Sequence, residues 1–292
     1  MKVAIVGHLG KGELPQAVSA FVQALQREKV EFLVESGVAK LMKEKGRIGS
    51  IKESGSTDEI LNESDILAAF GGDGTILAAA RAAGPRGIPI IGINLGKLGF
   101  LAEVAPSEME EAIADLKAGR YQIEKRSVLL GESDQLRNSP ITAVNDIVVA
   151  KGRSSRIITL EAHVNDIPAV TYRGDGLIVS TPTGSTAYAL SNGGPIVIPG
   201  SQVFGLTPIS PHSLSGRPLI VPENSILTVT GSDENESVLI SADGQEEAVV
   251  ASLFTLQIRK ADYSLNLVRR AKHSYFEVLR AKLLWGRDPR SH

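Results

Sequence analysis

Residues 65–83 read DILAAFGGDGTILAAARAA and place a glycine-rich turn between two regular elements. The continuous apolar run 65–70 is typical of a strand buried on both faces, and the alanine-rich run 75–83 predicts a helix. The same alternation extends from Lys2 to about Gly119, with KVAIVG at 2–7, a helix at 15–28, VEFLVE at 30–35 and IPIIGIN at 88–94. This pattern predicts a three-layer, Rossmann-like α/β domain whose ligand edge lies at the carboxyl ends of the strands.

After an expected helix at 106–117, the sequence changes to short β-rich runs separated by Gly, Asp, Asn, Ser and Pro. Such runs predict an all-β region, a sandwich. They lie at 121–131, 141–152, 156–165, 167–173, 176–181, 225–231, 237–245 and 253–260, and a last helix is expected at 274–284. We therefore expect an α/β domain at 1–121 with a C-terminal return at 269–292, and a β-sandwich domain at 122–268. The glycine-rich loops of the two domains are expected to face one cleft.

The composition excludes several classes of protein. Lys and Arg number 31 against 33 Asp and Glu among 292 residues, so no basic excess favours nucleic acid or an anionic membrane surface. No apolar run approaches the roughly 20 residues of a membrane span. The absence of cysteine excludes a thiolate nucleophile and fits a reducing compartment. We expect a cytoplasmic protein without a nucleic-acid or membrane partner.

The turn GGDGT, at 71–75, has the features of a phosphate-binding loop. Free N–H groups and the positive end of the dipole meet at a helix N-terminus, and glycines let an anion approach and permit positive φ. A carboxylate at Asp73 would repel phosphate, so its expected partner is a hydroxyl or a metal ion beside the phosphate. The alternative is a tight turn in which Asp73 caps the helix. The chain contains no GxxxxGK[ST], and no GxGxxG follows its first strand.

Three further segments carry candidate ligand-binding residues. Phe100 follows the loop GINLGKLG and either packs in the core or stacks on a base. Asn145 and Asp146 interrupt an apolar strand; because side chains alternate, one of them points inward, towards a ligand or a structural partner. Residues 172–196, YRGDGLIVSTPTGSTAYALSNGGPI, predict a strand, a proline turn and a helix whose first turn suits a base, ribose or phosphate, although a capped helix explains part of the pattern. The Asp-Gly pair at Asp243 predicts a hairpin turn.

Five of these motifs resemble, in order and spacing, those of the bacterial NAD kinases. They are GGDGT from Gly71, NLGKLGF from Asn94, NDIVV from Asn145, GDGLIVSTPTGSTAY from Gly174 and SNGGPI from Ser191. The resemblance extends over residues 70–245. GGDGT alone is shared with diacylglycerol, sphingosine and phosphofructokinase relatives, whereas the long segment from Gly174 is far more specific.

The resemblance implies a nucleotide-binding α/β domain, a sandwich that completes the NAD site, and a homotetramer or homodimer. It implies transfer of a phosphoryl group from ATP, or polyphosphate, with Mg²⁺, to the 2′-hydroxyl of the adenosine ribose of NAD. Asp73 falls on the residue that binds this hydroxyl and acts as the base. The positions assigned to NAD are Gly74, Phe100, Asn145, Asp146, Asp175, Thr183, Thr186, Ala187, Tyr188 and Ser191, and those assigned to phosphate are Gly71, Gly72 and Arg173. No residue is assigned to a metal.

One position departs from the family pattern, because many relatives have glutamate where this chain has Asp146. The shorter side chain draws the charge back, so a water-mediated contact to a ribose hydroxyl is expected. Two other functions remain open. A lipid or sugar kinase would share only GGDGT, and a silent NAD(P)-binding sensor would bind without turnover. Kinase assays with NAD, diacylglycerol and fructose 6-phosphate as acceptors distinguish an NAD kinase from a lipid or sugar kinase. Release of ADP on mixing with NAD and MgATP distinguishes an NAD kinase from a silent sensor.

Overall fold

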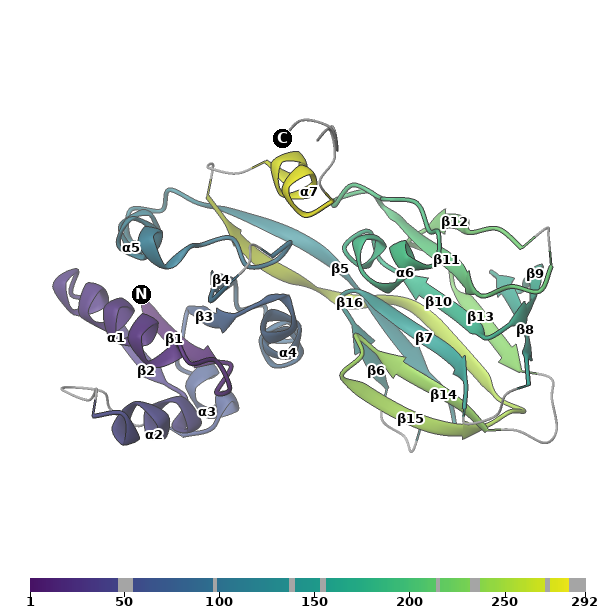
Figure 1. Ribbon diagram of the computed structural model, residues 1–292, viewed down its shortest axis with the longest axis horizontal. Helices are drawn as coiled ribbons and strands as arrows, with labels where there is room; N and C mark the ends of the chain where they lie inside the picture. Colours follow the sequence, from purple (N-terminus) through teal and green to yellow (C-terminus); the bar gives the residue numbers. More distant parts are fainter. Residues whose placement is uncertain are drawn as a thin grey trace, which may run out of the picture. The chain divides into compact units, whose positions relative to one another are not determined.

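The computed structural model describes residues 1–46, 55–96, 99–136, 140–152, 156–213, 216–231, 237–270 and 274–283. The chain divides into two compact units, Met1–Lys125 with Leu265–His292, and Arg126–Ser264 (Figure 1). The boundaries fall within two long strands, β5 (Gln122–Glu132) and β16 (Thr255–Arg269).

The first unit is built on a parallel sheet. Its strands lie in the order β2 (Glu31–Val34), β1 (Lys2–Gly7), β3 (Ile66–Gly71) and β4 (Ile90–Asn94), and Leu267 of β16 pairs with Ile90. The helical elements are α1 (Leu14–Arg27), α2 (Ser36–Glu44), α3 (Thr57–Leu61), α4 (Asp73–Ala83), η1 (Pro106–Glu108), α5 (Met109–Lys117) and α7 (Tyr275–Leu283).

Both faces of this sheet are buried, as the continuous apolar runs predict. Every residue of β3 and β4 is buried. One face, including Phe70, packs in a core with α1, α2 and α5, where the rings of Phe21 and Phe70 meet edge to face at 5.2 Å. The alternate residue Leu67 is equally buried, and α3 and α4 contact the strands from that side. The predicted three-layer α/β domain is confirmed.

The second unit is an antiparallel sandwich, also as predicted. One sheet has the order β12 (Leu219–Pro222), β11 (Val203–Ile209), β10 (Gly176–Ser180), β7 (Asp146–Lys151), β14 (Ser237–Ala242) and β15 (Glu246–Ala251). The other contains β9 (Ile167–Gly174), β8 (Ile158–Val164), β13 (Leu227–Gly231) and the first part of β16, with β5 and β6 (Ile141–Ala143) beside it. Inward side chains of both sheets, such as Ile147 and Leu227, form one hydrophobic core.

Several local expectations were wrong. The strand expected at 141–152 is two strands, β6 and β7, with Val144 and Asn145 between them. The helix expected after Pro182 is a 3-10 turn, η2 (Gly184–Thr186), followed by the single turn α6 (Tyr188–Ser191), because Ala187 has a non-helical conformation with φ −99° and ψ −128°. The sequence interpretation missed α2, α3, β11, β12 and β15.

Among the helices of the described residues, none has the length and apolar character that crossing a membrane requires.

Candidate functional site

The β3–α4 junction of the first unit is a very tight turn in which only Gly72 separates the two elements. None of Gly71, Gly72 and Gly74 has positive φ, so the positive φ that glycine permits is not used in this turn. Gly71 is required for space, because a Cβ there would collide with the side chain of Thr75. At Gly72 a Cβ would meet nothing within 4 Å, so the backbone beside the N-terminus of α4 is open to an approaching group.

Asp73 does not cap its helix. The N-cap is Gly72, without a side-chain bond, so the capping alternative is wrong. The carboxylate instead accepts hydrogen bonds from the backbone N–H groups of Phe100 (2.9 Å), Leu101 (2.9 Å) and Ala102 (3.3 Å). Gly99 packs against the same carboxylate, since a Cβ at Gly99 would collide with Oδ1 of Asp73. Asp73 thus ties the loop after β4 to the start of α4.

This environment keeps Asp73 ionised. Burial raises the pKa of its carboxyl, but the three N–H bonds and the charge of Lys282 outweigh burial and hold the pKa below its ordinary value. Nζ of Lys282 lies 3.3 Å from Oδ2 of Asp73. An ionised carboxylate at this position accepts hydrogen bonds and does not donate them.

Phe100 lies beside Asp73. Its N–H binds Asp73, and its ring lies 6.2 Å from the ring of Tyr275 and 4.6 Å from Nζ of Lys282. Its carbonyl accepts a hydrogen bond from Arg269, which also pairs with acidic side chains. The structure therefore brings together the predicted residues Gly71, Gly72, Asp73, Gly74 and Phe100 at the carboxyl ends of β3 and β4, where Gly71 pairs with Asn94. We call this group the Asp73 site.

In the second unit, Asp243 organises the segment that carries Asn145 and Asp146. Asp243 lies in the predicted hairpin turn between β14 and β15, with φ 53°, followed by Gly244 with φ 62°. Its carboxylate accepts hydrogen bonds from the N–H groups of Val144 (3.0 Å), Asn145 (2.7 Å) and Asp146 (3.2 Å). The sequence interpretation treated Asp243 as a turn residue alone; only its Asp-Gly dipeptide gave a signal.

Asp146 is the inward residue of the Asn145–Asp146 pair, with 4% of its surface exposed. Burial and the nearby charge of Asp243 raise the pKa of Asp146 to about 7, although the N–H of Tyr188 donates a hydrogen bond to it. Because that donor begins α6, Asp146 is linked directly to the segment 183–191.

The segment after β10 packs against Asn145. The N–H of Thr181 donates to the carbonyl of Asn145 at 2.9 Å, and a Cβ at Gly184 would collide with that carbonyl. Thr183 is buried and accepts a hydrogen bond from Arg126 at 3.2 Å. Arg126, which is also buried, was missed by the sequence interpretation, because nothing in YQIEKRSVLLG marks it. The predicted residues Asn145, Asp146, Thr183, Thr186, Ala187, Tyr188 and Ser191 thus lie in one segment pair, which we call the Asp146 site.

Asp175 and Arg173 lie elsewhere in the second unit. Asp146 pairs with Ser180 at one end of the β7–β10 pair, whereas the N–H of Lys151, at the other end, donates to the carbonyl of Asp175. Five residues at about 3.3 Å each separate the two ends by about 16 Å. The Asp175 carboxylate pairs with Nζ of Lys151 at 2.7 Å, and this ion pair lowers the pKa of Asp175. Arg173 is exposed on β9.

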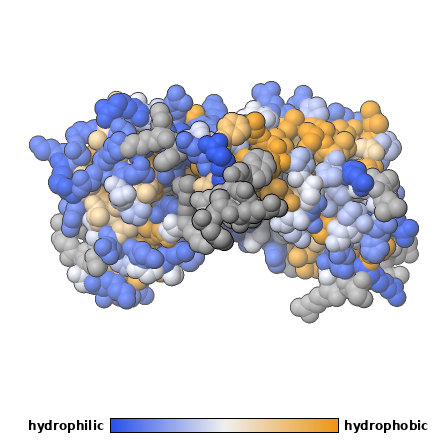
Figure 2. Space-filling model, turned by 45° about the horizontal axis from the view of Figure 1, so that its top comes forward, coloured by the Kyte–Doolittle hydropathy of each residue, from blue (hydrophilic) through white to orange (hydrophobic). Residues whose placement is uncertain are grey.

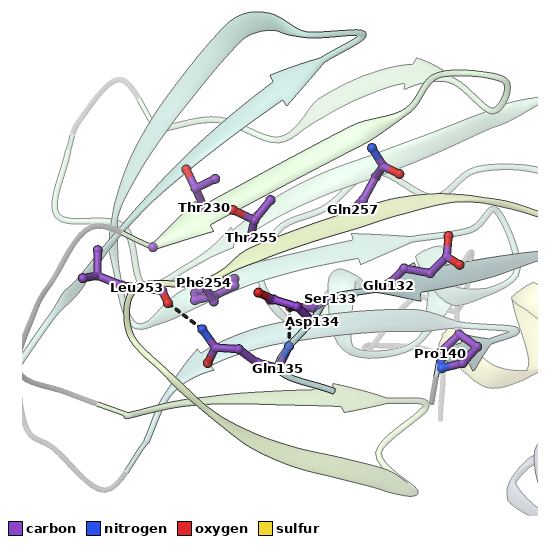
Figure 3. A pocket seen from close by; sticks show the side chains of 11 residues that line it. Glu132, Ser133, Asp134, Gln135, Pro140, Thr230, Leu253, Phe254, Thr255 and Gln257 are labelled. Carbon is purple, nitrogen blue, oxygen red and sulfur yellow. Dashed lines mark hydrogen bonds between the residues drawn. The ribbon is translucent and has the colours of Figure 1, made fainter. Parts of the chain in front are cut away.

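A cavity of about 870 Å³ in the second unit contains none of the predicted site residues (Figure 3). Its wall is formed by residues of β5, β13 and β16 and the segments beside them, including Gln135, which donates a hydrogen bond to the carbonyl of Leu253 at 2.6 Å. This cavity therefore does not coincide with the residues that the motifs select.

The chain matches two family models. Residues 3–121 match the ATP-NAD kinase N-terminal domain, and residues 144–270 match the ATP-NAD kinase C-terminal domain. The NAD kinase of Bacteroides fragilis is 39% identical over 292 residues, covering 99% of this chain and 100% of that protein. The NAD kinase of Caldanaerobacter subterraneus is 40% identical over 286 residues, covering 97% of this chain and 98% of that protein.

Two solved structures are similar over almost the whole chain. Yeast NADH kinase complexed with NADH has a TM-score of 0.89 and 26% identity, covering 100% of this chain and 90% of that one. An NAD kinase from Archaeoglobus fulgidus in complex with ATP has a TM-score of 0.75 and 25% identity, covering 97% of this chain and 99% of that one.

Proposed function

Because the chain belongs to the ATP-NAD kinase family, it is a kinase that phosphorylates NAD, and we propose that Asp73 binds the acceptor hydroxyl and takes its proton. The acceptor is the 2′-hydroxyl of the adenosine ribose. The observation that carries the proposal is the Asp73 carboxylate, fixed by three backbone N–H groups and held ionised at the start of α4.

The lowered pKa of Asp73 decides how it acts. A weakly basic carboxylate does not remove the proton before the reaction, but it accepts a hydrogen bond and orients the hydroxyl oxygen towards the phosphorus. In a loose phosphoryl-transfer transition state this orientation is most of the task. As the O2′–P bond forms, the bond between the γ-phosphorus and the β,γ-bridging oxygen of ATP breaks, ADP leaves, and the hydroxyl proton passes to Asp73.

The phosphates of the donor are proposed to bind at Gly71 and Gly72. The first N–H groups of α4 lack intrahelical partners, the positive end of the helix dipole lies there, and the backbone of Gly72 is open. Arg173 is retained as a phosphate contact because its exposed guanidinium suits bidentate binding.

NAD is proposed to bind Gly74 and Phe100 at the Asp73 site and the residues of the Asp146 site, with Asp175 at the far end of the β7–β10 pair. We propose that the first unit is the nucleotide-binding domain and that the second unit also contributes residues to NAD binding. Asp146 is too buried to reach out to a ligand, which supports the expected water-mediated contact.

Mg²⁺ is proposed to enter with the phosphates of ATP. The described residues contain no group of three or more His, Asp or Glu side chains that could hold a metal ion. Mg²⁺ commonly keeps several waters and takes its remaining ligands from substrate phosphates and few carboxylates, so no dedicated cage is required. Its chemistry, when bound, is to neutralise charge on the transferred phosphoryl group.

Self-association and a cytoplasmic location complete the proposal. Exposed large hydrophobic side chains of the second unit include Ile167, Ile198, Ile220 and Val249, and Figure 2 shows hydrophobic surface over part of this unit. Contiguous exposed apolar surface marks interaction surfaces, and the hydrophobic surface in Figure 2 supports a homodimer or homotetramer.

The test is an assay of ADP release with MgATP, run side by side with NAD, with NADH and without an acceptor. When NAD is the acceptor, we expect ADP to be released together with an equal amount of a product that co-elutes with authentic NADP. Release of ADP at the same rate without an acceptor, or a product phosphorylated at another position, would overturn the proposal.

A further inference from the structure

The C-terminal helix α7 places a cation directly on the Asp73 site. Lys282, in the last turn of α7, lies 3.3 Å from Oδ2 of Asp73 and 4.6 Å above the ring of Phe100. Lys282 lies 209 positions from Asp73 in the sequence and belongs to the same unit. No sequence motif that we recognised included Lys282, so its position is a finding of the structure.

The hydrogen bonds of Asp73 show what this contact does. An ionised carboxylate has about four lone-pair sites. Oδ1 accepts from the N–H groups of Leu101 and Ala102, and Oδ2 accepts from the N–H of Phe100 and from Nζ of Lys282. All four sites are therefore taken, and a substrate hydroxyl can bind Asp73 only if one donor leaves.

Lys282 is the donor that can leave. The other three are backbone N–H groups held by the loop after β4, whereas Lys282 is a side chain on a flexible four-carbon stem with 30% of its surface exposed. Its ammonium also lies over the face of Phe100, which supplies a second favourable partner while the bond to Asp73 is broken.

We propose that Lys282 is a catalytic residue that occupies the acceptor site of Asp73 until the substrate hydroxyl arrives, and that its ammonium then moves to the phosphoryl group being transferred. The inference rests on the proposed role of Asp73. An ammonium displaced from a carboxylate can bind the negative charge of a phosphate group, because the ammonium of Lys acts as a compact positive point charge. The exchange keeps the positive charge at the place where negative charge gathers during transfer.

The other charged groups near Asp73 do not supply this cation. Arg269 approaches the carbonyl of Phe100 at 3.0 Å, but it is paired with Glu103 at 2.8 Å and Glu124 at 2.6 Å. Lys282 is a charged side chain that lowers the pKa of Asp73.

The test compares Lys282→Met, Lys282→Arg and the control Arg280→Met, an exposed cation on the same helix. For Lys282→Met we expect kcat to fall about 10- to 100-fold, while NAD affinity measured without ATP is unchanged or tighter. The acid limb of the kcat/KM profile should move to higher pH, because in the free enzyme loss of the ammonium raises the pKa of Asp73. Lys282→Arg should recover part of kcat, and Arg280→Met should behave as wild type.

Two results would overturn the proposal in an active wild-type enzyme. One is a Lys282→Met enzyme with the kcat and pH profile of Arg280→Met. The other is a loss of NAD affinity that accounts for the whole loss in kcat/KM, since a displaced residue cannot be needed for ground-state binding. A wild-type enzyme that forms no NADP would instead reject the proposed function itself, so the two failures are distinguishable.

Discussion

The carboxylate of Asp243 accepts a hydrogen bond from the backbone N–H of Asn145 at 2.7 Å, across 98 positions of sequence. This bond and its neighbours at Val144 and Asp146 fix the break between β6 and β7. A turn residue on one hairpin thereby shapes the segment that carries two predicted NAD contacts.

The first prediction concerns Asp243→Asn. Asparagine tolerates the left-handed φ of 53° and keeps the turn, but it offers one acceptor oxygen where aspartate offers two. The NH2 group of its amide then faces one of the three backbone N–H groups, which loses its acceptor. The free energy of unfolding should therefore fall by about 1–3 kcal/mol. The KM for NAD should rise. Urea unfolding and steady-state kinetics measure both, with Asp166→Asn as control, since Asp166 also has positive φ in a hairpin of this unit. Equal stability of the two variants would contradict the role of Asp243.

The second prediction concerns the pH dependence of stability through Asp146. Its pKa is about 7 in the folded protein and 3.8 ordinarily, so between these values the folded chain holds a proton that the unfolded chain has released. The contribution of Asp146 to stability therefore falls as pH rises through this window and is lowest above pH 7. Asp146→Asn removes this dependence, and from pH 5 to pH 8 it should gain about 1–3 kcal/mol relative to wild type.

Urea titrations at four pH values test the Asp146 prediction. Asp262→Asn is the control, because that side chain lies in the same unit and is 92% exposed. A stability difference between Asp146→Asn and wild type that stays constant with pH would show that Asp146 ionises normally in the folded protein.

The third prediction uses the open backbone at Gly72. A Cβ there meets nothing within 4 Å, and φ of −102° suits alanine, so Gly72→Ala should fold with wild-type stability. The methyl group would nevertheless stand where phosphate is proposed to approach, and the KM for ATP should rise about 10-fold or more. Gly12→Ala is the matched control, as its Cβ also meets nothing. Identical ATP kinetics in the two variants would place the phosphates elsewhere.

The alternation of apolar runs and helices predicted the α/β layers, because strands buried on both faces, such as β3, need continuous apolar sequence. The proline-interrupted β-rich runs likewise predicted the sandwich. The local sequence pattern did not predict the secondary structure where a contact from a distant segment determines the backbone conformation. Asn145 leaves the strand because Asp243 binds its N–H, and Ala187 interrupts the helix next to Tyr188, whose N–H binds Asp146.

The candidate site shows the same limit. Motifs found Asp73 and Phe100, but nothing in GGDGT indicates that its carboxylate binds the N–H groups of residues 100–102. The roles of Arg126, Asp243 and Lys282 were missed because each acts through a tertiary contact. The local sequence marked Asp243 as a turn residue alone and did not mark the other two.

The last prediction concerns Asp73→Asn. Asparagine keeps the shape and one acceptor oxygen, but it cannot take the hydroxyl proton, so kcat should fall about 10²- to 10⁴-fold while NAD binding persists. The NH2 group of its amide faces one of the backbone N–H groups of the loop after β4, and that N–H loses its acceptor. The free energy of unfolding should therefore fall by about 1–2 kcal/mol. Rapid-quench measurement of NADP formation and calorimetric titration with NAD separate chemistry from binding. Asp58→Asn is the control, because it removes an exposed carboxylate of the same unit that pairs with Arg86 at 2.8 Å. An Asp73→Asn enzyme with near wild-type turnover would mean that the hydroxyl loses its proton to another group.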